Sequence, residues 1–482
     1  MKNTETNWVI CSNCQGRGKK SRRLRKKVRL SFQRALEAFE KSNNQGLPPI
    51  KPKAHLSICE DCAGSGLMQS DCAMVADTKK YPHVAIIGGG IGGVALAVAL
   101  LHRAIPFTLY ERDAGFDTRA QGYGLTLQQA SKAIEGLGIF DLKEGVVSTK
   151  HVVHSTDGEI LGQWGVRKWL QSDVKKTDKR TNVHIARQSL RMALLEQLGG
   201  EGQVSWGHQL IDFQELDEGG VNLNFLLDGK LKNAKADIVV GADGIRSTVR
   251  NLLIGEEQSP LRYLDCIVIL GICPLADLDG FEHELLDGLT VFQTANGNER
   301  MYMMPYASDS VMWQLSFPMS LSDAKTLSVK GAQALKDEAC CRTQWHDPIP
   351  QIVTATKTAM VSGYPVYDRE LLQPELLGKS EHITLIGDAA HPMSPFKGQG
   401  ANQALLDALA LARNIKKGCN PLTNWREVGV RTSVLTEFET QMLERVASKV
   451  SGSAAAAKFL HSEVVLHKSD APRGRNIQQE EQ

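Results

Sequence analysis

Two pairs of cysteines near the N-terminus have a spacing that suits metal chemistry. The sequence reads Cys11-x-x-Cys14-x-Gly-x-Gly and, later, Cys59-x-x-Cys62-x-Gly-x-Gly. Two thiolates separated by two residues can chelate one ion, and four thiolates complete a tetrahedral zinc site, while the glycines permit tight turns around it. We therefore predict a structural zinc ion held by these four residues. A redox-active dithiol pair and free thiols are the alternatives.

A glycine-rich turn between an apolar run and a helical segment suits the binding of a dinucleotide. Residues 88–93 read GGGIGG, which is the G-x-G-x-x-G pattern. The first glycine permits the tight turn, the second lets a pyrophosphate approach the backbone, and the third allows close packing of helix and strand. A carboxylate 23 residues after Gly88 can accept hydrogen bonds from ribose hydroxyls. The predicted cofactor contacts here are Gly88, Gly90, Ile91, Gly93 and Glu111.

Two further motifs favour FAD over NAD as the dinucleotide. Residues 241–250 read GADGIRSTVR, and residues 387–404 read GDAAHPMSPFKGQGANQA. Asp388 ends a predicted strand at the carboxyl edge of a sheet, where it can accept hydrogen bonds from flavin ribityl hydroxyls. The loop from Pro395 to Gly400 precedes a helix, so its N–H groups and the helix dipole can face the flavin pyrimidine ring.

Together, the three motifs resemble those of the class A flavoprotein monooxygenases, the aromatic hydroxylase family that includes the tetracycline-inactivating enzymes. The resemblance covers about residues 83–465. It implies bound FAD, NAD(P)H and O2 as co-substrates, and an aromatic or polycyclic small molecule as substrate. The further cofactor contacts that it implies are Arg112, Arg119, Arg187, Asp243, Asp388, Pro395, Gly398, Gly400, Ala401 and Asn402. For the charged residues among them, a solvated surface position is the alternative.

Within this resemblance, Arg187 lies beside the flavin, and Glu111 with Arg112 lies on the adenosine side. Arg119 is a looser match to an arginine that contacts the nicotinamide cofactor, and Asp243 matches an aspartate linked to both cofactors. No acid or base residue is nominated, because the cofactor carries the chemistry and the protein orients it. An FAD-dependent reductase or dehydrogenase of the same fold, or a flavin-bearing binding protein, are the competing hypotheses.

The cysteine motifs have a resemblance of their own. They resemble the cysteine-rich zinc region of DnaJ-type chaperones, which carries four copies where this chain has two. The spacer of 44 residues between the pairs departs from that family. Within the spacer, residues 19–29 hold eight Lys or Arg in eleven positions, ahead of a helical run. A protein or anionic partner is one hypothesis for this segment, and a solvated face is the other.

The elements that must position these residues follow from the apolar pattern. Short apolar runs at 83–88, 107–111, 236–241 and 382–387 are typical of a parallel sheet covered on both faces. Between 260 and 320, strand-like runs joined by short polar segments indicate an antiparallel sheet. Such a sheet would form one wall of a substrate cavity. The candidate lining residues, for which core packing is the alternative, are Tyr302, Met304, Trp313 and Phe317.

The predicted fold is therefore α/β: a Rossmann-like FAD-binding domain, an interleaved antiparallel-sheet substrate domain and a small zinc module. The predicted boundaries are 1–75 for the cysteine-rich module with its basic helix, 76–82 for a linker, 83–420 for the FAD-binding domain with the substrate domain at about 255–380, 421–465 for C-terminal helices and 466–482 for a polar tail.

Charge and cysteine content place further bounds on the chain. Its net charge is only +2 over 482 residues, but residues 1–80 hold 16 Lys or Arg against 7 Asp or Glu. Few cysteines in a large chain and an N-terminus unlike a signal peptide predict a reduced, cytoplasmic protein. Residues 84–101 lack any charge, but their glycines fit the nucleotide turn, so no transmembrane segment is expected.

Overall fold

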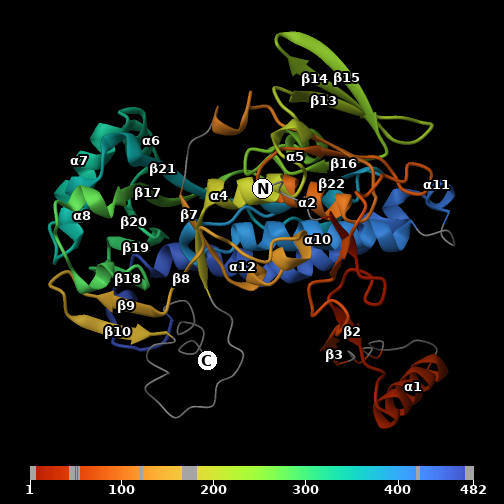
Figure 1. The fold of residues 1–482 in the computed structure, drawn as a ribbon, viewed down its shortest axis with the longest axis horizontal. Helices are drawn as coiled ribbons and strands as arrows, with labels where there is room; N and C mark the ends of the chain where they lie inside the picture. The colour runs from red at the N-terminus through yellow and green to blue at the C-terminus, as the bar shows by residue number, and fades with distance from the viewer. Residues whose placement is uncertain are drawn as a thin grey trace. The chain divides into compact units, whose positions relative to one another are not determined.

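The computed structural model describes residues 7–42, 49, 52, 55–118, 123–165, 182–419 and 424–472. The predicted contact Arg119 and residues 473–482 of the predicted polar tail lie outside them. Contacts within the chain divide it into two compact units, Met1–Val75 and Ala76–Gln482. Figure 1 traces both units from the N-terminus to the C-terminus.

The N-terminal unit is built on two short antiparallel strand pairs. Strand β1 (Asn7–Ile10) pairs with β4 (Leu67–Ser70), and β2 (Lys19–Ser21) pairs with β3 (Leu56–Ile58). Each pair joins a strand next to the first cysteine motif to a strand next to the second. Helix α1 (Lys26–Lys41) lies in the connection between β2 and β3. The pairing therefore brings the two cysteine motifs together across a long insertion.

The larger unit contains the predicted parallel sheet, with strand order β12-β6-β5-β16-β22. Its strands are all parallel and short, and β5, β16 and β22 are wholly buried, which explains their continuous apolar sequences. The prediction of a parallel sheet is thus confirmed. The strands are β5 (Val84–Ile87), β6 (Phe107–Tyr110), β12 (Val204–Ser205), β16 (Ile238–Gly241) and β22 (Ile383–Leu385).

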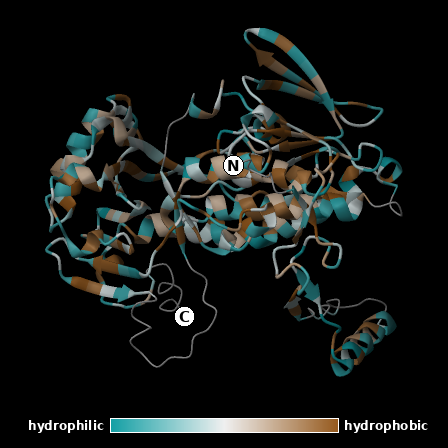
Figure 2. Cartoon of the chain, in the orientation of Figure 1, coloured by the Kyte–Doolittle hydropathy of each residue, from teal (hydrophilic) through white to brown (hydrophobic). Residues whose placement is uncertain are grey.

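Helix α2 (Ile91–Leu101) follows the glycine-rich turn and is buried nearly all round. Such a helix is apolar on every side, which accounts for the uncharged stretch in the sequence. It packs against α10 (Gly400–Gly418), where a Cβ added to Gly92 would lie 3.4 Å from Ala404 Cβ. Figure 2 shows apolar residues gathered in these central strands and helices. Among the described helices, none is both long and apolar enough to cross a membrane.

A second, seven-stranded sheet has the order β10-β9-β18-β19-β20-β17-β21 and is antiparallel except between β9 and β18. The prediction of an antiparallel sheet is confirmed for β17 to β20. Strands β9 and β10 precede the predicted substrate domain. The sequence of β9, KHVVH, has polar ends, and that of β10, ILGQW, contains a glycine, so neither carries a strong strand signal. The strands are β9 (Lys150–His154), β10 (Ile160–Trp164), β17 (Arg262–Pro274), β18 (Thr290–Ala295), β19 (Arg300–Ala307), β20 (Ser310–Pro318) and β21 (Val361–Asp368).

One face of the seven-stranded sheet forms a core with helices, and two of the four candidate cavity residues belong to that core, as the core-packing interpretation predicts. Trp313 and Phe317 of β20 are fully buried in that core, because alternate residues of a strand share a face. Trp313 Nε1 donates to Thr356 Oγ1 at 2.9 Å. Tyr302 and Met304 lie on the opposite face. The covering helices are α6 (Leu321–Val329), α7 (Ala332–Arg342) and α8 (Ile349–Ala355).

Two three-stranded sheets complete the larger unit, and the sequence patterns did not reveal them. In one, β11 contacts β19 and β7 contacts α10, so this small sheet links the two larger sheets. The other is a meander that follows β12 in the chain. The first of these sheets consists of β7 (Gly124–Leu127), β11 (Val183–Ala186) and β8 (Val146–Val147). The meander consists of β13 (Gln209–Glu215), β14 (Val221–Leu227) and β15 (Lys230–Ala236).

Candidate cofactor site

The glycine-rich turn has the packing that its sequence predicts. Gly88 has φ +111°, and a Cβ there would come within 2.5 Å of the Ala242 carbonyl oxygen. A Cβ on Gly93 would lie 1.9 Å from the Gly88 carbonyl oxygen. A Cβ on Gly90 would instead have only Arg187 Nη2 near it, at 3.9 Å. Gly88 and Gly93 therefore close the turn against the sheet, while Gly90 leaves its outer side open to a ligand.

Glu111 follows β6 and is fixed to this turn. Its Oε2 accepts a hydrogen bond from Gly89 N at 2.7 Å, and its Oε1 accepts one from Asp113 N at 3.0 Å. A carboxylate has about four acceptor positions, so each oxygen keeps capacity for a further donor. The neighbouring Arg112 has an exposed side chain. The fold therefore places Glu111 beside the glycine-rich turn, as the sequence predicts.

Helix α4 (Arg187–Glu196) carries two guanidinium groups to the same turn. Arg187 is its first residue, and its guanidinium carbon lies 5.6 Å from the ring centroid of Tyr123. Arg191, one turn later, donates from Nε to the Gly89 carbonyl oxygen at 2.8 Å. Burial lowers the pKa of Arg191. Sequence reasoning selected Arg187 and missed Arg191, although the spacing of four in one helix was a usable signal.

Asp388 follows β22 and faces the first turn of α10. A Cβ on Gly400 would lie 3.3 Å from Asp388 Oδ1. Burial raises the pKa of Asp388, and the positive charge of Arg187 opposes that rise. The same charges of Arg187 and Asp388 act on the pKa values of Tyr123 and Tyr364, which burial raises. Asp388, Tyr123 and Tyr364 nevertheless remain exposed to solvent. Together with Arg187 they place four titratable groups, from four separate segments of the chain, around one region.

Asn402 fastens the loop before α10 to the end of β7. Its Oδ1 accepts hydrogen bonds from two backbone N–H groups, and its Nδ2 donates to two backbone carbonyls. All four partners are backbone atoms, so Asn402 positions the loop. Its direct contact with the cofactor stays a prediction. The partners are Gln128 N at 2.8 Å, Ala130 N at 3.1 Å, Thr126 O at 2.9 Å and Gly398 O at 2.9 Å.

The loop itself is a short helical turn followed by a glycine. Residues Pro395–Lys397 form one 3-10 turn, and Gly398 follows with φ +57°. That left-handed conformation favours glycine and turns the chain into α10. Ala401 lies half-buried in the first turn of that helix. The predicted contacts of this segment are therefore adjacent in space to Asp388.

A buried carboxylate that sequence reasoning missed holds the third motif in place. Asp407 Oδ2 accepts a hydrogen bond from Gly387 N at 2.9 Å and lies 2.7 Å from His391 Nε2. Its other oxygen forms an ion pair with Arg445 of α12 (Thr436–Phe459). Asp407 is completely buried within α10. A buried charge of this kind is stable only when paired and hydrogen-bonded, so the motif and two helices are tied together.

Asp243 caps a helix rather than pointing freely from the second motif. It accepts hydrogen bonds from Thr248 N at 2.7 Å and Val249 N at 3.2 Å, at the start of α5 (Thr248–Ile254). From the same helix, Arg250 donates to the Ala389 and Ala390 carbonyls at 2.8 and 3.0 Å. The second motif therefore supports the third through Arg250. A direct contact of Asp243 with a cofactor stays a prediction.

The face of the seven-stranded sheet opposite helices α6 to α8 carries a buried cation. Arg300 is 5% exposed, and its Nε donates to Gln293 Oε1 at 2.9 Å. Its guanidinium lies 5.0 Å from the Tyr302 ring centroid. Among the ion pairs of the described residues, none pairs a carboxylate with this guanidinium. Burial lowers the pKa of Arg300 to about 10, so it keeps its charge at neutral pH.

This face adjoins the loop of the third motif. His461 Nε2 lies 2.9 Å from Ser316 Oγ of β20, and its ring centroid is 5.4 Å from that of Phe396. Met304 lies against β7, with its sulfur 3.9 Å from Thr126 Oγ1. The charge of Arg300 lowers the pKa of His461, in addition to the larger effect of burial. Sequence reasoning did not select Arg300, whose only signal is a lone cation at the start of an apolar strand.

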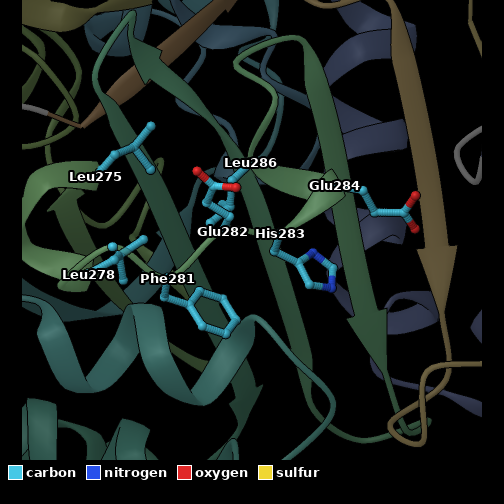
Figure 3. A pocket seen from close by; sticks show the side chains of 8 residues that line it. Leu275, Leu278, Phe281, Glu282, His283, Glu284 and Leu286 are labelled. Carbon is cyan, nitrogen blue, oxygen red and sulfur yellow. The ribbon is translucent and has the colours of Figure 1, made fainter.

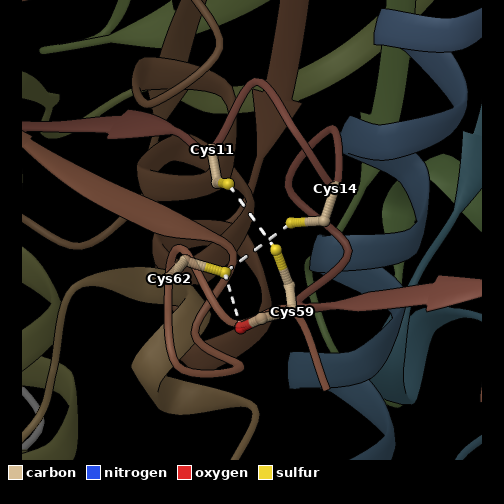
Figure 4. Close-up of side chains that lie close together, drawn as sticks. All are labelled: Cys11, Cys14, Cys59 and Cys62. Atoms are coloured by element: carbon tan, nitrogen blue, oxygen red, sulfur yellow. Dashed lines mark hydrogen bonds between the residues drawn. The ribbon is translucent and has the colours of Figure 1, made fainter. Parts of the chain in front are cut away.

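In the N-terminal unit, the four predicted cysteines converge (Figure 4). All are buried, and their sulfur atoms lie within 4.8 Å of one another. The sulfurs of Cys11 and Cys59 are 3.9 Å apart, and those of Cys14 and Cys62 are 3.7 Å apart. Each motif repeats one hydrogen bond, in which a glycine N–H donates to sulfur. These bonds run from Gly18 N to Cys14 Sγ at 3.2 Å and from Gly66 N to Cys62 Sγ at 3.3 Å.

A separate open pocket of about 660 Å³ lies beside the seven-stranded sheet (Figure 3). None of its lining residues belongs to the three motifs or to the sheet face that carries Arg300. We assign no part of the cofactor site to it. Its walls are Leu275, Leu278, Gly280, Phe281, Glu282, His283, Glu284 and Leu286.

A parallel sheet with a dinucleotide turn, joined to a second sheet that faces the flavin motif, defines a flavin-binding fold. The chain belongs to the FAD binding domain family, whose model matches residues 81–420. It is 25% identical over 395 residues to the chloroplastic zeaxanthin epoxidase of Oryza sativa subsp. japonica, covering 79% of this chain and 56% of that protein. It thus spans little more than half the length of that relative.

Three further likenesses agree with this family. The aurachin C monooxygenase/isomerase of Stigmatella aurantiaca is 29% identical over 333 residues, covering 68% of this chain and 79% of that protein. HpxO of Klebsiella pneumoniae, solved with FAD and uric acid, has a TM-score of 0.64 at 21% identity, covering 79% and 89% of the two chains. The tetracycline destructase Tet(51) has a TM-score of 0.55 at 17% identity, covering 82% and 93%. The predicted fold and the resemblance to flavin monooxygenases are confirmed.

Proposed function

We propose that this chain is an FAD-dependent monooxygenase that uses NAD(P)H and O2 to hydroxylate an aromatic or polycyclic small molecule. The observation that carries the proposal is the meeting of the three motifs at the carboxyl edge of the parallel sheet, beside the face of a second sheet that carries Arg300. FAD supplies the transfer of electrons from NAD(P)H to O2. The protein contributes binding, orientation and exclusion of water.

The residues present fit FAD. The open side of Gly90 and the first N–H groups of α2 suit a pyrophosphate, and Glu111 keeps acceptor capacity for ribose hydroxyls. Asp388 is accessible at the start of α10, where it can accept hydrogen bonds from ribityl hydroxyls. The positive end of the α10 dipole favours the negative charge that the flavin ring gains on reduction.

The sheet face beside the flavin motif supports a substrate with an acidic group. Arg300 is buried, charged and bonded to a neutral amide, so a carboxylate or phenolate would supply the counter-charge that the described residues do not. Tyr302 and Met304 on the same face offer apolar and aromatic surface. We therefore propose that Arg300 contacts the substrate and that the ring of the substrate lies against Tyr302.

Oxygen dependence tests the proposed reaction. The purified chain, loaded with FAD, should oxidise NADH or NADPH faster when suitable phenols or polycyclic acids are added, with equal uptake of O2. Mass spectrometry should find a product that contains one oxygen atom from labelled O2. A reductase or dehydrogenase would complete its cycle under argon, and product formation without O2 would overturn the proposal.

We also propose that the four cysteines hold one structural zinc ion. Tetrahedral thiolate ligands at about 2.3 Å from zinc lie about 3.8 Å from one another. The distances of 3.9 and 3.7 Å between paired sulfurs match that geometry. The N–H groups that donate to sulfur stabilise thiolates, which supports a metal in preference to free thiols.

A further inference from the structure

Helix α1 of the N-terminal unit has an apolar stripe that is largely exposed in the part of the chain that the structure describes. Phe32 and Phe39 in this stripe are half-buried, and its other residues are exposed. Its apolar residues recur at spacings of three and four, which places them on one side of a helix. None of the residues of α1 is buried, and Val28 and Leu36 are 39% and 38% exposed. Figure 2 shows apolar and polar positions mixed along this helix. The stripe consists of Val28, Phe32, Ala35, Leu36 and Phe39.

The polar sides of the helix carry more basic than acidic residues, and a dense basic segment precedes the helix. The charged residues of α1 are Lys26, Lys27, Arg29, Arg34 and Lys41 against Glu37 and Glu40. Eight of the eleven residues from 19 to 29 are Lys or Arg, and no acidic residue lies in the first turn of α1. At 100° per residue, Lys27 and Arg34 lie on one side of the stripe and Arg29 lies on the other. Long basic side chains can reach past an apolar stripe to anionic groups while their stems cover apolar surface. The helix is therefore amphipathic and cationic at once.

The fold presents this helix as an insertion. It lies in the connection between β2 and β3, whose pairing holds the two ends of the insertion together next to the cysteine cluster. Its 16 residues are too few and too charged to cross a bilayer. Aromatic and aliphatic residues on one side, with Lys and Arg on the others, are the composition of helices that lie in the plane of a membrane interface.

We propose that α1 binds the surface of a membrane that contains anionic lipids. Val28, Phe32, Leu36 and Phe39 enter the boundary between headgroups and acyl chains, while the basic residues contact lipid phosphates and carboxylates. A nucleic acid would satisfy the charge but leave the apolar stripe in water, so the two features together favour lipid. The proposal is independent of the reaction that the larger unit performs.

Vesicle flotation with the full chain tests the proposal. The protein should float with vesicles of phosphatidylcholine and phosphatidylserine, and remain unbound with phosphatidylcholine alone or at high salt. The pair Phe32→Ser and Phe39→Ser keeps every charge and should weaken binding by about tenfold or more. The pair Lys26→Glu and Arg29→Glu should weaken it similarly. Leu30→Ser is the matched control, because Leu30 is 40% exposed on the same helix but lies outside the stripe.

Several outcomes would overturn the proposal. One is failure of the full chain to float with the anionic vesicles, and another is full binding after both Phe changes. An oligonucleotide that binds the Phe variant as well as the original chain, and displaces the vesicles, would assign the helix to nucleic acid. Loss of a dimer in the Phe variant without any vesicle binding would assign the stripe to self-association. Zinc and flavin contents of each variant verify that the chain is folded.

Discussion

At the scale of single residues, the site combines groups that the motifs specify with groups that only their surroundings reveal. Asp388 belongs to a motif, and its place at the start of α10 follows from the strand before it. Arg300 belongs to no motif. Its importance comes from burial beside Tyr302 and Gln293, with no carboxylate partner in the part of the chain that the structure describes. The two residues lead to different predictions, one for the cofactor and one for the substrate.

Changing Asp388 to Ala should weaken FAD binding by about 1–3 kcal/mol, the loss of a charge-assisted hydrogen bond. Asp388 is an exposed residue, and substitutions at exposed positions usually change stability by no more than about 0.5 kcal/mol. The variant should therefore unfold no more easily than the original chain when FAD is removed. Titration of the stripped proteins with FAD, followed by fluorescence, measures the difference. An unchanged affinity would remove Asp388 from the site, and Asp337→Ala on the exposed surface is the control.

Changing Arg300 to Gln should raise KM for an acidic substrate by about tenfold to a hundredfold, because a charge-assisted hydrogen bond contributes about 1.5–3 kcal/mol. FAD content should stay the same. Steady-state rates with a carboxylic acid and with its neutral amide distinguish recognition of the substrate's charge from packing of the sheet. If the KM of the carboxylic acid and the KM of the amide rise by the same factor, Arg300 supports only the packing of the sheet. Arg300→Lys keeps the charge and should recover part of the affinity.

At the scale of elements, the glycine-rich turn joins β5 to α2 with no spare room. Changing Gly93 to Ala would put a methyl group 1.9 Å from the Gly88 carbonyl oxygen, so strand and helix must move apart. We expect loss of FAD and a lower melting temperature. Gly115→Ala is the matched control, since a Cβ there would meet nothing within 4 Å. Normal flavin content in the Gly93 variant would contradict the close packing of this turn.

The cysteine cluster makes a prediction about the small N-terminal unit. Metal analysis should find one zinc per chain, and replacing Cys59 and Cys62 by Ser should remove it. Because ligands from both motifs hold the strand pairs together, the unit should then lose its protection from proteolysis. The larger unit should keep its FAD. Zinc retained by the double variant would place the metal elsewhere.

At the scale of the whole molecule, the two units have internal contacts of their own. The segment predicted as a linker is tied to the larger unit, since Asp77 N donates to the Ala104 carbonyl at 2.8 Å and Tyr81 is buried. Trp425 Nε1 also donates to the Lys80 carbonyl at 2.9 Å. A chain that starts near residue 77 therefore keeps every contact of the flavin-binding motifs.

We expect residues 77–482 to fold, bind FAD and oxidise NAD(P)H at the rate of the full chain. The reason is that the nucleotide turn, the third motif and both sheets lie after residue 77. Flavin content and turnover of the two proteins, measured side by side, test this. An insoluble or flavin-free product would show that the N-terminal unit is a structural part of the enzyme.

The sequence alone determined what depends on neighbours along the chain. The turn at residues 88–93, the cysteine motifs and the strand before Asp388 were predictable, because glycine conformations, chelate spacing and apolar runs are local properties. The position of Glu111 was also predictable from the sequence, since one helix and one strand set its distance from the turn. FAD as the cofactor followed from three such local patterns together.

Only the tertiary structure decided what depends on pairing between distant segments. Asn402 was predicted as a cofactor contact, and only the structure shows that it also fastens β7 to α10. Asp407 showed no signal before its partners Gly387 and Arg445 came together. Trp313 and Arg300 lie on neighbouring strands, but opposite faces of the sheet make one a core residue and the other a candidate substrate contact. Strand register sets the face, and register is fixed by packing between sheets and helices, which no local pattern contains.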